Sequence, residues 1–325
     1  MHLISTFTMR MNEDIEVKQS KPFPLLTMVI VLLCIGVYAT VKIKFGDGQV
    51  PNDFYPYLGA PFTSDIYLGQ FWGIITNNFL HLYWFHLLIN VVLVFSFSSF
   101  IERRISFFRL FFLGLSVAAF SSCAQLFLTN DPGIGLDGVN YGLFGFILVR
   151  RFFDARFKKF PIKRVSMLMI VLMTTCYYLT IIYHWKFEFV AMFSGFMIGV
   201  VVSFLYVKKM FSTMFMLLIG ATIFCVINFV NAPWSSEWNF AQGIKYHESG
   251  DIEKAIDFYD KSLEINPNNK LAQENLRRIK IDKLCERAYE AHAKEDYVEA
   301  RKLYLEVLKI DKDNVWANEN FKKLP

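Results

Sequence analysis

The sequence predicts an all-α, polytopic membrane protein that ends in a helical-repeat domain. The chain is 54% hydrophobic and only 19% charged, whereas soluble domains carry roughly 25% charged residues. The last ninety residues are polar, and they repeat themselves with an offset of 45 residues. Before them, seven apolar runs approach or exceed the roughly 17–25 residues that cross a bilayer as a helix. These runs lie near residues 23–41, 79–101, 107–128, 136–153, 165–183, 187–207 and 210–230.

Lysine and arginine in the short loops predict the orientation of these spans, because such residues gather on the cytoplasmic side. Fifteen lie on the side of the N-terminus, against three on the other side. We therefore expect a multi-pass protein of the cell membrane with a cytoplasmic tail over 1–22. Six spans follow within 23–207 and a seventh within 208–231, which places the repeat domain, 236–325, outside the cytosol.

The segment between the first two spans, 45–78, is too polar and broken to cross the bilayer. It is rich in aromatic side chains, among them Tyr57, Phe71 and Trp72, and such rings settle at the membrane–water interface. We interpret it as a loop lying partly in the outer leaflet, with an ordinary aromatic-anchored loop as the alternative.

The repeat is visible letter by letter. GDIEKA at 250–255 recurs as EDYVEA at 295–300, and LEINPNN at 263–269 recurs as LKIDKDN at 308–314. Small and aromatic residues at helical spacing make each unit resemble a tetratricopeptide repeat, whose usual period is about 34 residues. The surplus predicts an extra helical stretch over 270–283. Two units fall short of the three or so that such arrays need, so the tail should lean on the membrane domain, a second copy or a partner.

Two stretches carry polar groups at membrane depth. In the second span, His86 and Asn90 are four residues apart and share one helix face, while His81 lies more than a turn above them. The fourth span opens with GLDGVNYGLFG at 135–145, which places the carboxylate of Asp137 just inside the membrane. Because burying such a charge costs roughly 3 kcal/mol or more, an ionisable residue there is a functional hypothesis.

These motifs resemble the rhomboid family of intramembrane serine proteases. The three residues of the second span fit that family's His-x4-His-x3-Asn pattern. The stretch 135–145 fits its Gly-x-Ser-Gly-x-x-Tyr-Gly-Leu-Phe-Gly pattern, and AMFSGFMIG at 191–199 fits its Ala-His-x-x-Gly-x-x-x-Gly pattern. The resemblance covers roughly 23–207 and implies a six-helix bundle. A seventh span followed by extracytosolic repeats is similar to one bacterial branch of the family.

The same resemblance exposes two departures at the reaction centre. The family's nucleophilic serine is replaced by Asp137, and its general-base histidine by Met192. A serine protease needs a hydroxyl nucleophile and a base within hydrogen-bond reach. Neither Ser194, on the same helix as Met192, nor His184, above that helix, is placed to replace them. We therefore expect family-type catalysis to be absent.

The rest of the family's site is retained. By resemblance, His86 and Asn90 belong to the corner that stabilises an oxyanion, and His81, Gly135 and Gly138 accompany them. Two small-xxx-small faces should let the fourth and sixth helices approach closely; they pair Gly138 with Gly142 and Gly195 with Gly199.

Three roles are open for Asp137. Its carboxylate can pair with a protonated His86 or His81, or accept from amides at its helix N-terminus, as a structural group. It can share a proton with Glu188, in the manner of paired catalytic carboxylates. It can also join the two histidines as a zinc ligand; we expect the first role, with no bound metal.

The function implied is that of a rhomboid-like pseudoprotease that binds transmembrane client proteins without cleaving them. The alternatives are an active intramembrane endopeptidase of altered, Asp137-based mechanism, and a passive membrane anchor for the repeats. We expect no cofactor and no nucleic-acid partner. The expected partners are client helices, a protein or peptide on the repeats, and membrane lipid, with a homo-oligomer left open.

Overall fold

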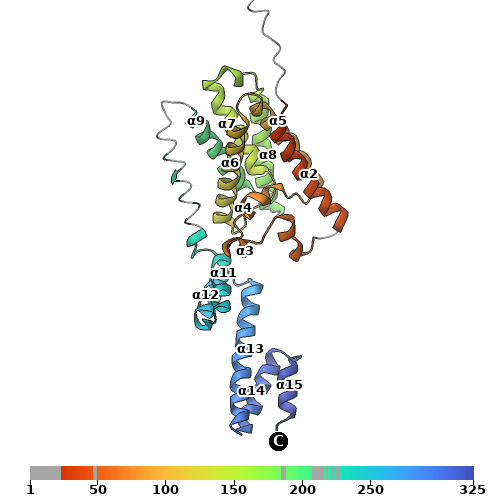
Figure 1. The fold of residues 1–325 in the computed structure, drawn as a ribbon, viewed down its shortest axis with the longest axis vertical. Coiled ribbons are helices and arrows are strands. Elements are labelled where there is room, and N and C mark those ends of the chain that lie inside the picture. Colours follow the sequence, from red (N-terminus) through yellow and green to blue (C-terminus); the bar gives the residue numbers. More distant parts are fainter. Residues whose placement is uncertain are drawn as a thin grey trace, which may run out of the picture. The chain divides into compact units, whose positions relative to one another are not determined.

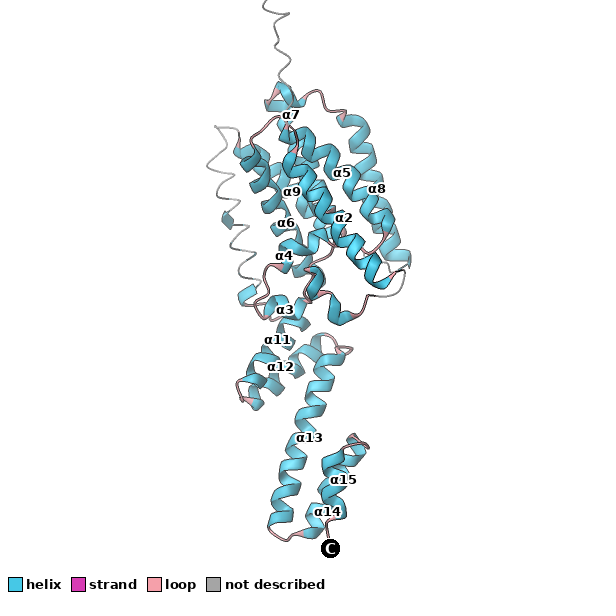
Figure 2. Ribbon diagram, turned by 45° about the vertical axis from the view of Figure 1, so that its right-hand side comes forward, coloured by secondary structure: helices cyan, strands magenta, loops and turns pink. Residues whose placement is uncertain are grey.

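The structure, a computed structural model, is helical throughout its described part and contains no strand there (Figure 2). This confirms the all-α prediction. The predicted tail, 1–22, and most of the predicted seventh span, 208–231, lie outside the described residues. The described residues are 23–46, 50–183, 188–206 and 229–325, with a few single residues between 216 and 227.

Six helices of the described chain form the bundle, and each overlaps one of the predicted spans (Figure 1). Four of them are long and apolar enough to cross a membrane. These are α2 (Leu25–Phe45), α5 (Trp84–Glu102), α6 (Phe107–Thr129) and α8 (Ile162–Tyr183). The other two have 17 residues each, about 25 Å of helix; they are α7 (Asp137–Phe153) and α9 (Phe189–Leu205).

Helix α7 is the buried centre of the bundle, and glycines set its distance from α9. A Cβ added at Gly199 would collide with the carbonyl oxygen of Gly142, and one at Gly195 with that of Gly138. The two backbones are therefore in direct contact, which is how small residues associate helices in lipid.

The start of α2 is fixed by a carboxylate from another helix. Glu102, the last residue of α5, accepts hydrogen bonds from the backbone amides of Leu26 (2.8 Å) and Thr27 (3.0 Å) and from the Thr27 hydroxyl (2.7 Å). The first amides of a helix have no partner within the helix, and α2 begins with Pro24 as its N-cap, which offers no side-chain hydrogen bond. Glu102 supplies the missing acceptors, so it joins α2 to α5.

The chain divides into two compact units, and the second gathers segments distant in sequence. It joins residues 61–73, between α2 and α5, and 126–132, at the end of α6, to residues 223–325. Within it, helix α11 (Ser236–Glu248) packs against α3 (Thr63–Tyr67). Ring contacts add to this: Phe127 lies 5.2 Å from Trp234, and Phe71 lies 5.4 Å from Phe229, between ring centroids.

The repeat domain continues with α12 (Ile252–Ile265), α13 (Lys270–Ala293), α14 (Tyr297–Ile310) and α15 (Val315–Lys322). The 45-residue offset reappears in the helix caps. Asp251 and Asp296 each accept from the backbone amide three residues later, and so do Asn269 and Asn314. The same side chain therefore starts the equivalent helix in both units.

The predicted extra stretch, 270–283, is not a separate element, because α13 continues through it without a break. The first part of α13 contributes Ala272 and Ile279 to a hydrophobic cluster with Tyr259. Its later part contributes Ala288 to a second cluster around Tyr304. One helix thus closes the first repeat and opens the second.

The segment between α2 and α5, predicted to be a loop, consists of short helices. Besides α3 it contains η1 (Asn52–Phe54), η2 (Pro56–Leu58), α4 (Gly73–Thr76) and η3 (Asn77–Phe79). After α7, the basic turn forms η4 (Ala155–Phe157).

Candidate functional site

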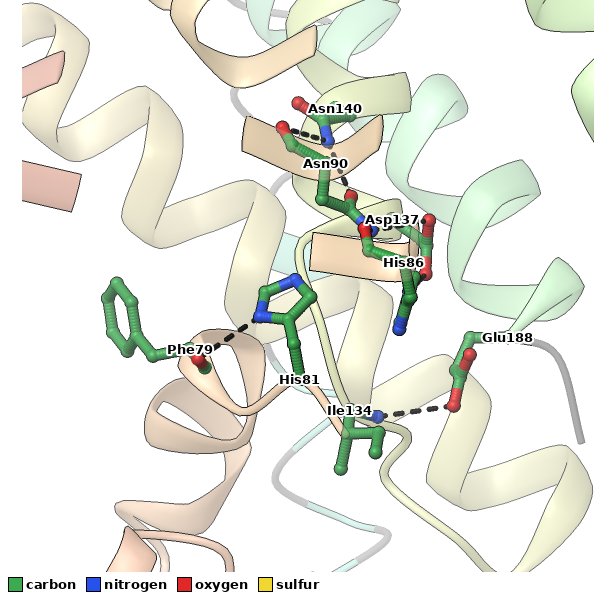
Figure 3. A network of polar contacts seen from close by, with 8 residues as sticks. All are labelled: Phe79, His81, His86, Asn90, Ile134, Asp137, Asn140 and Glu188. Atoms are coloured by element: carbon green, nitrogen blue, oxygen red, sulfur yellow. Dashed lines mark hydrogen bonds and ion pairs between the residues drawn. The ribbon is translucent and has the colours of Figure 1, made fainter. Parts of the chain in front are cut away.

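Asp137 is the first residue of α7, and its carboxylate faces α5 (Figure 3). His86 Nε2 lies 2.7 Å from its Oδ2, and Asn90 Nδ2 donates to its Oδ1 over 3.2 Å. Because an ionised carboxylate only accepts hydrogen bonds, the proton of this contact is on His86 Nε2. The four-residue spacing of His86 and Asn90 therefore brings both side chains to the same acid.

The sequence analysis did not identify Asn140, which extends this cluster. Its Nδ2 donates to Asn90 Oδ1 over 2.6 Å and faces the Asn90 carbonyl at 3.3 Å. Asn90 Nδ2 also donates to the carbonyl of His86 over 3.2 Å. The available signal was the three-residue step from Asp137 to Asn140, which places both on one helix face.

The cluster is buried between two helices. Asn90 and Asn140 have no exposed surface, and Asp137 is 8% exposed. A buried carboxylate is costly to desolvate unless it is paired and hydrogen-bonded. Asp137 meets this condition through one imidazole and one amide, so the cluster links α5 and α7 by charge-assisted hydrogen bonds.

His81 is not on the second helix, which corrects the predicted start of that span near 79. Leu80 and Tyr83 have extended backbone angles, and α5 begins only at Trp84. His81 is held in the preceding loop, with Nδ1 3.2 Å from the carbonyl oxygen of Phe79. Its ring is fully buried, 5.0 Å from that of His86 between centroids.

Two glycines allow the backbone to approach this cluster. Gly135 has φ +93°, and a Cβ there would come within 2.7 Å of His86 Cε1 and 3.3 Å of His81 Nε2. Gly138 faces Ser121 on α6, and a Cβ there would also lie 3.1 Å from the carbonyl oxygen of Ala191. Any larger residue at either position would displace the histidines or separate the helices.

On the other side of the site, α9 presents no group able to take a proton from a nucleophile. Met192 is 2% exposed and belongs to the hydrophobic core of the bundle. The amide of the preceding Ala191 donates to Gln125 Oε1 over 2.9 Å. Glu188, before α9, accepts from the Ile134 amide over 3.3 Å. Asp137 and Glu188 thus have different hydrogen-bond partners (Figure 3).

The arrangement limits the chemistry of the site. A thioether does not act as a base near neutral pH, and both carboxylate oxygens of Asp137 already accept hydrogen bonds. Within the described residues, no three His, Cys, Asp or Glu side chains are grouped to hold a metal ion, so the geometry gives no support to the zinc alternative. The predicted His184 lies outside the described residues.

Two domain families match the chain. The rhomboid domain matches residues 68–209, and the tetratricopeptide repeat matches residues 240–269. The first match contains α5 to α9 with the whole polar cluster, and the second contains α12 and most of α11. The fold and these matches define a membrane protein with a rhomboid domain followed by a tetratricopeptide repeat.

The chain is similar to proteins named rhomboid protease GlpG from Yersinia pestis (strain Pestoides F), Yersinia pseudotuberculosis (serotype O:3) and Yersinia enterocolitica (serotype O:8). Each is 31% identical over 122 residues, which is 38% of this chain and 42% of the relative. The similarity thus spans about two fifths of the length of these relatives.

Proposed function

We propose that this protein is a rhomboid-like pseudoprotease that binds transmembrane clients without cleaving them, while its repeats recruit a protein partner outside the membrane. The observation that carries the proposal is the occupation of the site by Asp137. Its carboxylate uses His86 Nε2 and Asn90 Nδ2, the donors that the family resemblance assigns to an oxyanion. An acid in this position occupies the corner with its own acceptor oxygens.

The character of α8 supports client binding. Only 6% of its most apolar stretch is buried, against 50% in α6 and 39% in α5. A hydrogen bond of 2.6 Å from the Tyr141 hydroxyl to the Met169 carbonyl connects α8 to α7. A long apolar helix with few internal contacts can move at low cost, and a client helix packs against such a face.

The second unit supports the predicted side of the repeats. Residues 61–73, 126–132 and α11 pack together, which supports placing the loop after α2, the end of α6 and the start of the repeats on one side of the membrane. Six spans, an even number, lie between the loop after α2 and α11 in the predicted topology, and an even number returns the chain to the same side. The bias of basic residues makes that side extracytosolic, which a reporter enzyme fused after residue 325 would test.

The direct test uses the full chain in liposomes with a single-span client protein. A photo-crosslinking amino acid at Tyr178 of α8 should capture the client. The matched control is the same amino acid at Leu32 of α2, because the two residues are 63% and 60% exposed. A passive anchor predicts no preference for α8.

The same liposomes test catalysis. The wild-type chain should leave the client intact, as judged by mass spectrometry. The double variant Asp137→Ser with Met192→His restores the residue types of the family's reaction centre and should cleave it. Cleavage by the wild type that is lost in Asp137→Ala would overturn the proposal in favour of an Asp137-based endopeptidase.

A further inference from the structure

A groove with a volume of about 210 Å³ lies between α2 and α6, and no residue of α9 is among those that line it. Its floor consists of three buried residues: Leu136, which directly precedes α7, and Val139 and Leu143 of α7. Its rim is formed by Val29 and Leu33 of α2 and by Phe111 and Leu115 of α6, which are 38–47% exposed. The groove therefore opens toward the lipid-facing surface of the bundle.

The groove offers no polar group that needs a ligand. Asn78 and Ser98 are the polar side chains among the residues that line it. Asn78 Nδ2 donates to the carbonyl of Ile74 and to the Ser122 hydroxyl. The Ser98 hydroxyl lies 2.8 Å from that of Thr27 and donates to it, because the Thr27 hydrogen is given to Glu102. The remaining lining is hydrocarbon apart from the backbone of Gly114, so the occupant of this groove is apolar.

The volume fits part of a hydrocarbon chain. Apolar cavities of about 150 Å³ bind benzene, with six carbons, so by proportion the 210 Å³ of the groove holds a segment of roughly eight carbons. A segment of an acyl chain therefore fits the groove.

One end of the groove lies near an arginine. Leu26, which lines the groove, is hydrogen-bonded through its amide to Glu102, and Arg103 follows Glu102 in sequence. Arg103 is exposed, where its charge complements an anionic lipid headgroup.

We propose that this groove is a binding site for one acyl chain of an anionic phospholipid, whose headgroup lies against Arg103. The bound chain rests on Leu136 and Val139, which precede and follow Asp137 at the start of α7. Lipid binding thereby stabilises the end of the helix that carries the polar cluster. This inference does not depend on whether the protein cleaves its clients.

The test uses the full chain in nanodiscs that contain phosphatidylglycerol with a photoactivatable group midway along one acyl chain. Peptide mapping should find the label concentrated on Val29, Leu33, Phe111 and Leu115. A phosphatidylcholine probe with the same acyl chain should label them less, by about fivefold for each arginine that contacts the headgroup.

Gly114 supplies the blocking variant. A Cβ at Gly114 would meet no atom within 4 Å, and the same holds at Gly36 on α2, which does not line the groove. Gly114→Leu should reduce groove labelling at least severalfold without misfolding the bundle, and Gly36→Leu should leave it unchanged. Gly114→Ala fills less of the groove and should reduce groove labelling by a smaller factor. It tests the proposal even if the larger leucine side chain disturbs α6.

Two outcomes would overturn the proposal. One is label spread evenly over all lipid-facing helices, including α8, and insensitive to Gly114→Leu, which is ordinary contact with bulk lipid. The other is equal labelling by the two probes, which removes the headgroup part of the site.

Discussion

At the scale of single residues, Asp137 is the acceptor on which the polar cluster between α5 and α7 is built. It lies at the N-terminus of α7, where the helix dipole favours a negative charge, and it accepts from His86 and Asn90. The helix dipole and the two hydrogen bonds thus offset the free-energy cost of burying the carboxylate. The first of the three roles considered for it, a structural pairing, is the one that this geometry favours.

We predict that Asp137→Ala destabilises the bundle by about 3 kcal/mol, because it leaves two buried donors without an acceptor. Asp137→Asn keeps the shape of the side chain and should cost less. Unfolding by SDS in mixed micelles would measure both. An alanine variant at least as stable as the wild type would mean that the carboxylate is held at a cost, as groups in active sites often are, and would favour the altered-mechanism alternative.

A second residue-scale prediction concerns Glu295, which stands 45 residues after Gly250 and shares its left-handed backbone. The two have φ +64° and +83°. Left-handed backbone costs a residue with a Cβ roughly 1–2 kcal/mol, which glycine avoids. Glu295→Gly should therefore slow amide hydrogen exchange in α13 and α14 by about fivefold, equivalent to ~1 kcal/mol.

The reverse change at the equivalent position is the control. A Cβ at Gly250 would meet no atom within 4 Å, so Gly250→Glu changes only the backbone preference. It should accelerate exchange in α11 and α12 by a similar factor. Equal exchange in all variants would show that the turn relaxes to another conformation.

At the scale of elements, the cap on α2 is the least expected connection in the bundle. Glu102→Ala removes the acceptor for two backbone amides and the Thr27 hydroxyl, at a cost of roughly 2–4 kcal/mol. Hydrogen exchange at Leu26 and Thr27 should accelerate before exchange in α5 does. Glu102→Gln keeps one acceptor oxygen, so its hydrogen exchange at Leu26 and Thr27 should be intermediate between that of the wild type and that of Glu102→Ala. An equal acceleration of exchange in all helices would contradict a local cap.

Sequence periodicity is sufficient to predict an interaction that is local to one helix. The four-residue step from His86 to Asn90 and the caps of the repeats follow from helix geometry alone. Periodicity does not predict an interaction whose two partners are remote in sequence. Glu102 and Leu26 are 76 residues apart, and among the several candidate partners of Asp137 only packing selects His86. The loop that holds His81 was misassigned as helix because its apolar neighbours, such as Leu80 and Leu82, continue the hydrophobic run.

At the scale of the whole molecule, the second compact unit joins the repeat helices to residues 61–73 and 126–132. Phe229 and Trp234 contact rings at Phe71 and Phe127, respectively. We predict that replacing Phe229 and Trp234 together by alanine raises hydrogen exchange in α3 by an order of magnitude or more, since aromatic pairs contribute about 0.5–1.5 kcal/mol beyond their buried area.

The matched control for that prediction is Trp316→Ala. Trp316 is 39% exposed, close to the 46% of Trp234, and it packs on Tyr304 in the distal repeat. It should accelerate exchange in α14 and leave α3 unchanged. If Trp316→Ala also released α3, the repeats would behave as one cooperative unit rather than as two clusters on a shared helix.

The shared helix α13 also sets the geometry of the repeats. The 45-residue offset exceeds the usual period of about 34 by eleven residues, which make just over three helical turns. The second repeat therefore keeps nearly the rotational phase it would have in a continuous array, while it is translated by about 16 Å along the helix axis. Inserting or deleting eleven residues in α13 would change mainly that translation, because eleven residues rotate the helix by only about 20° beyond three turns. A single inserted residue would rotate the second repeat by about 100°.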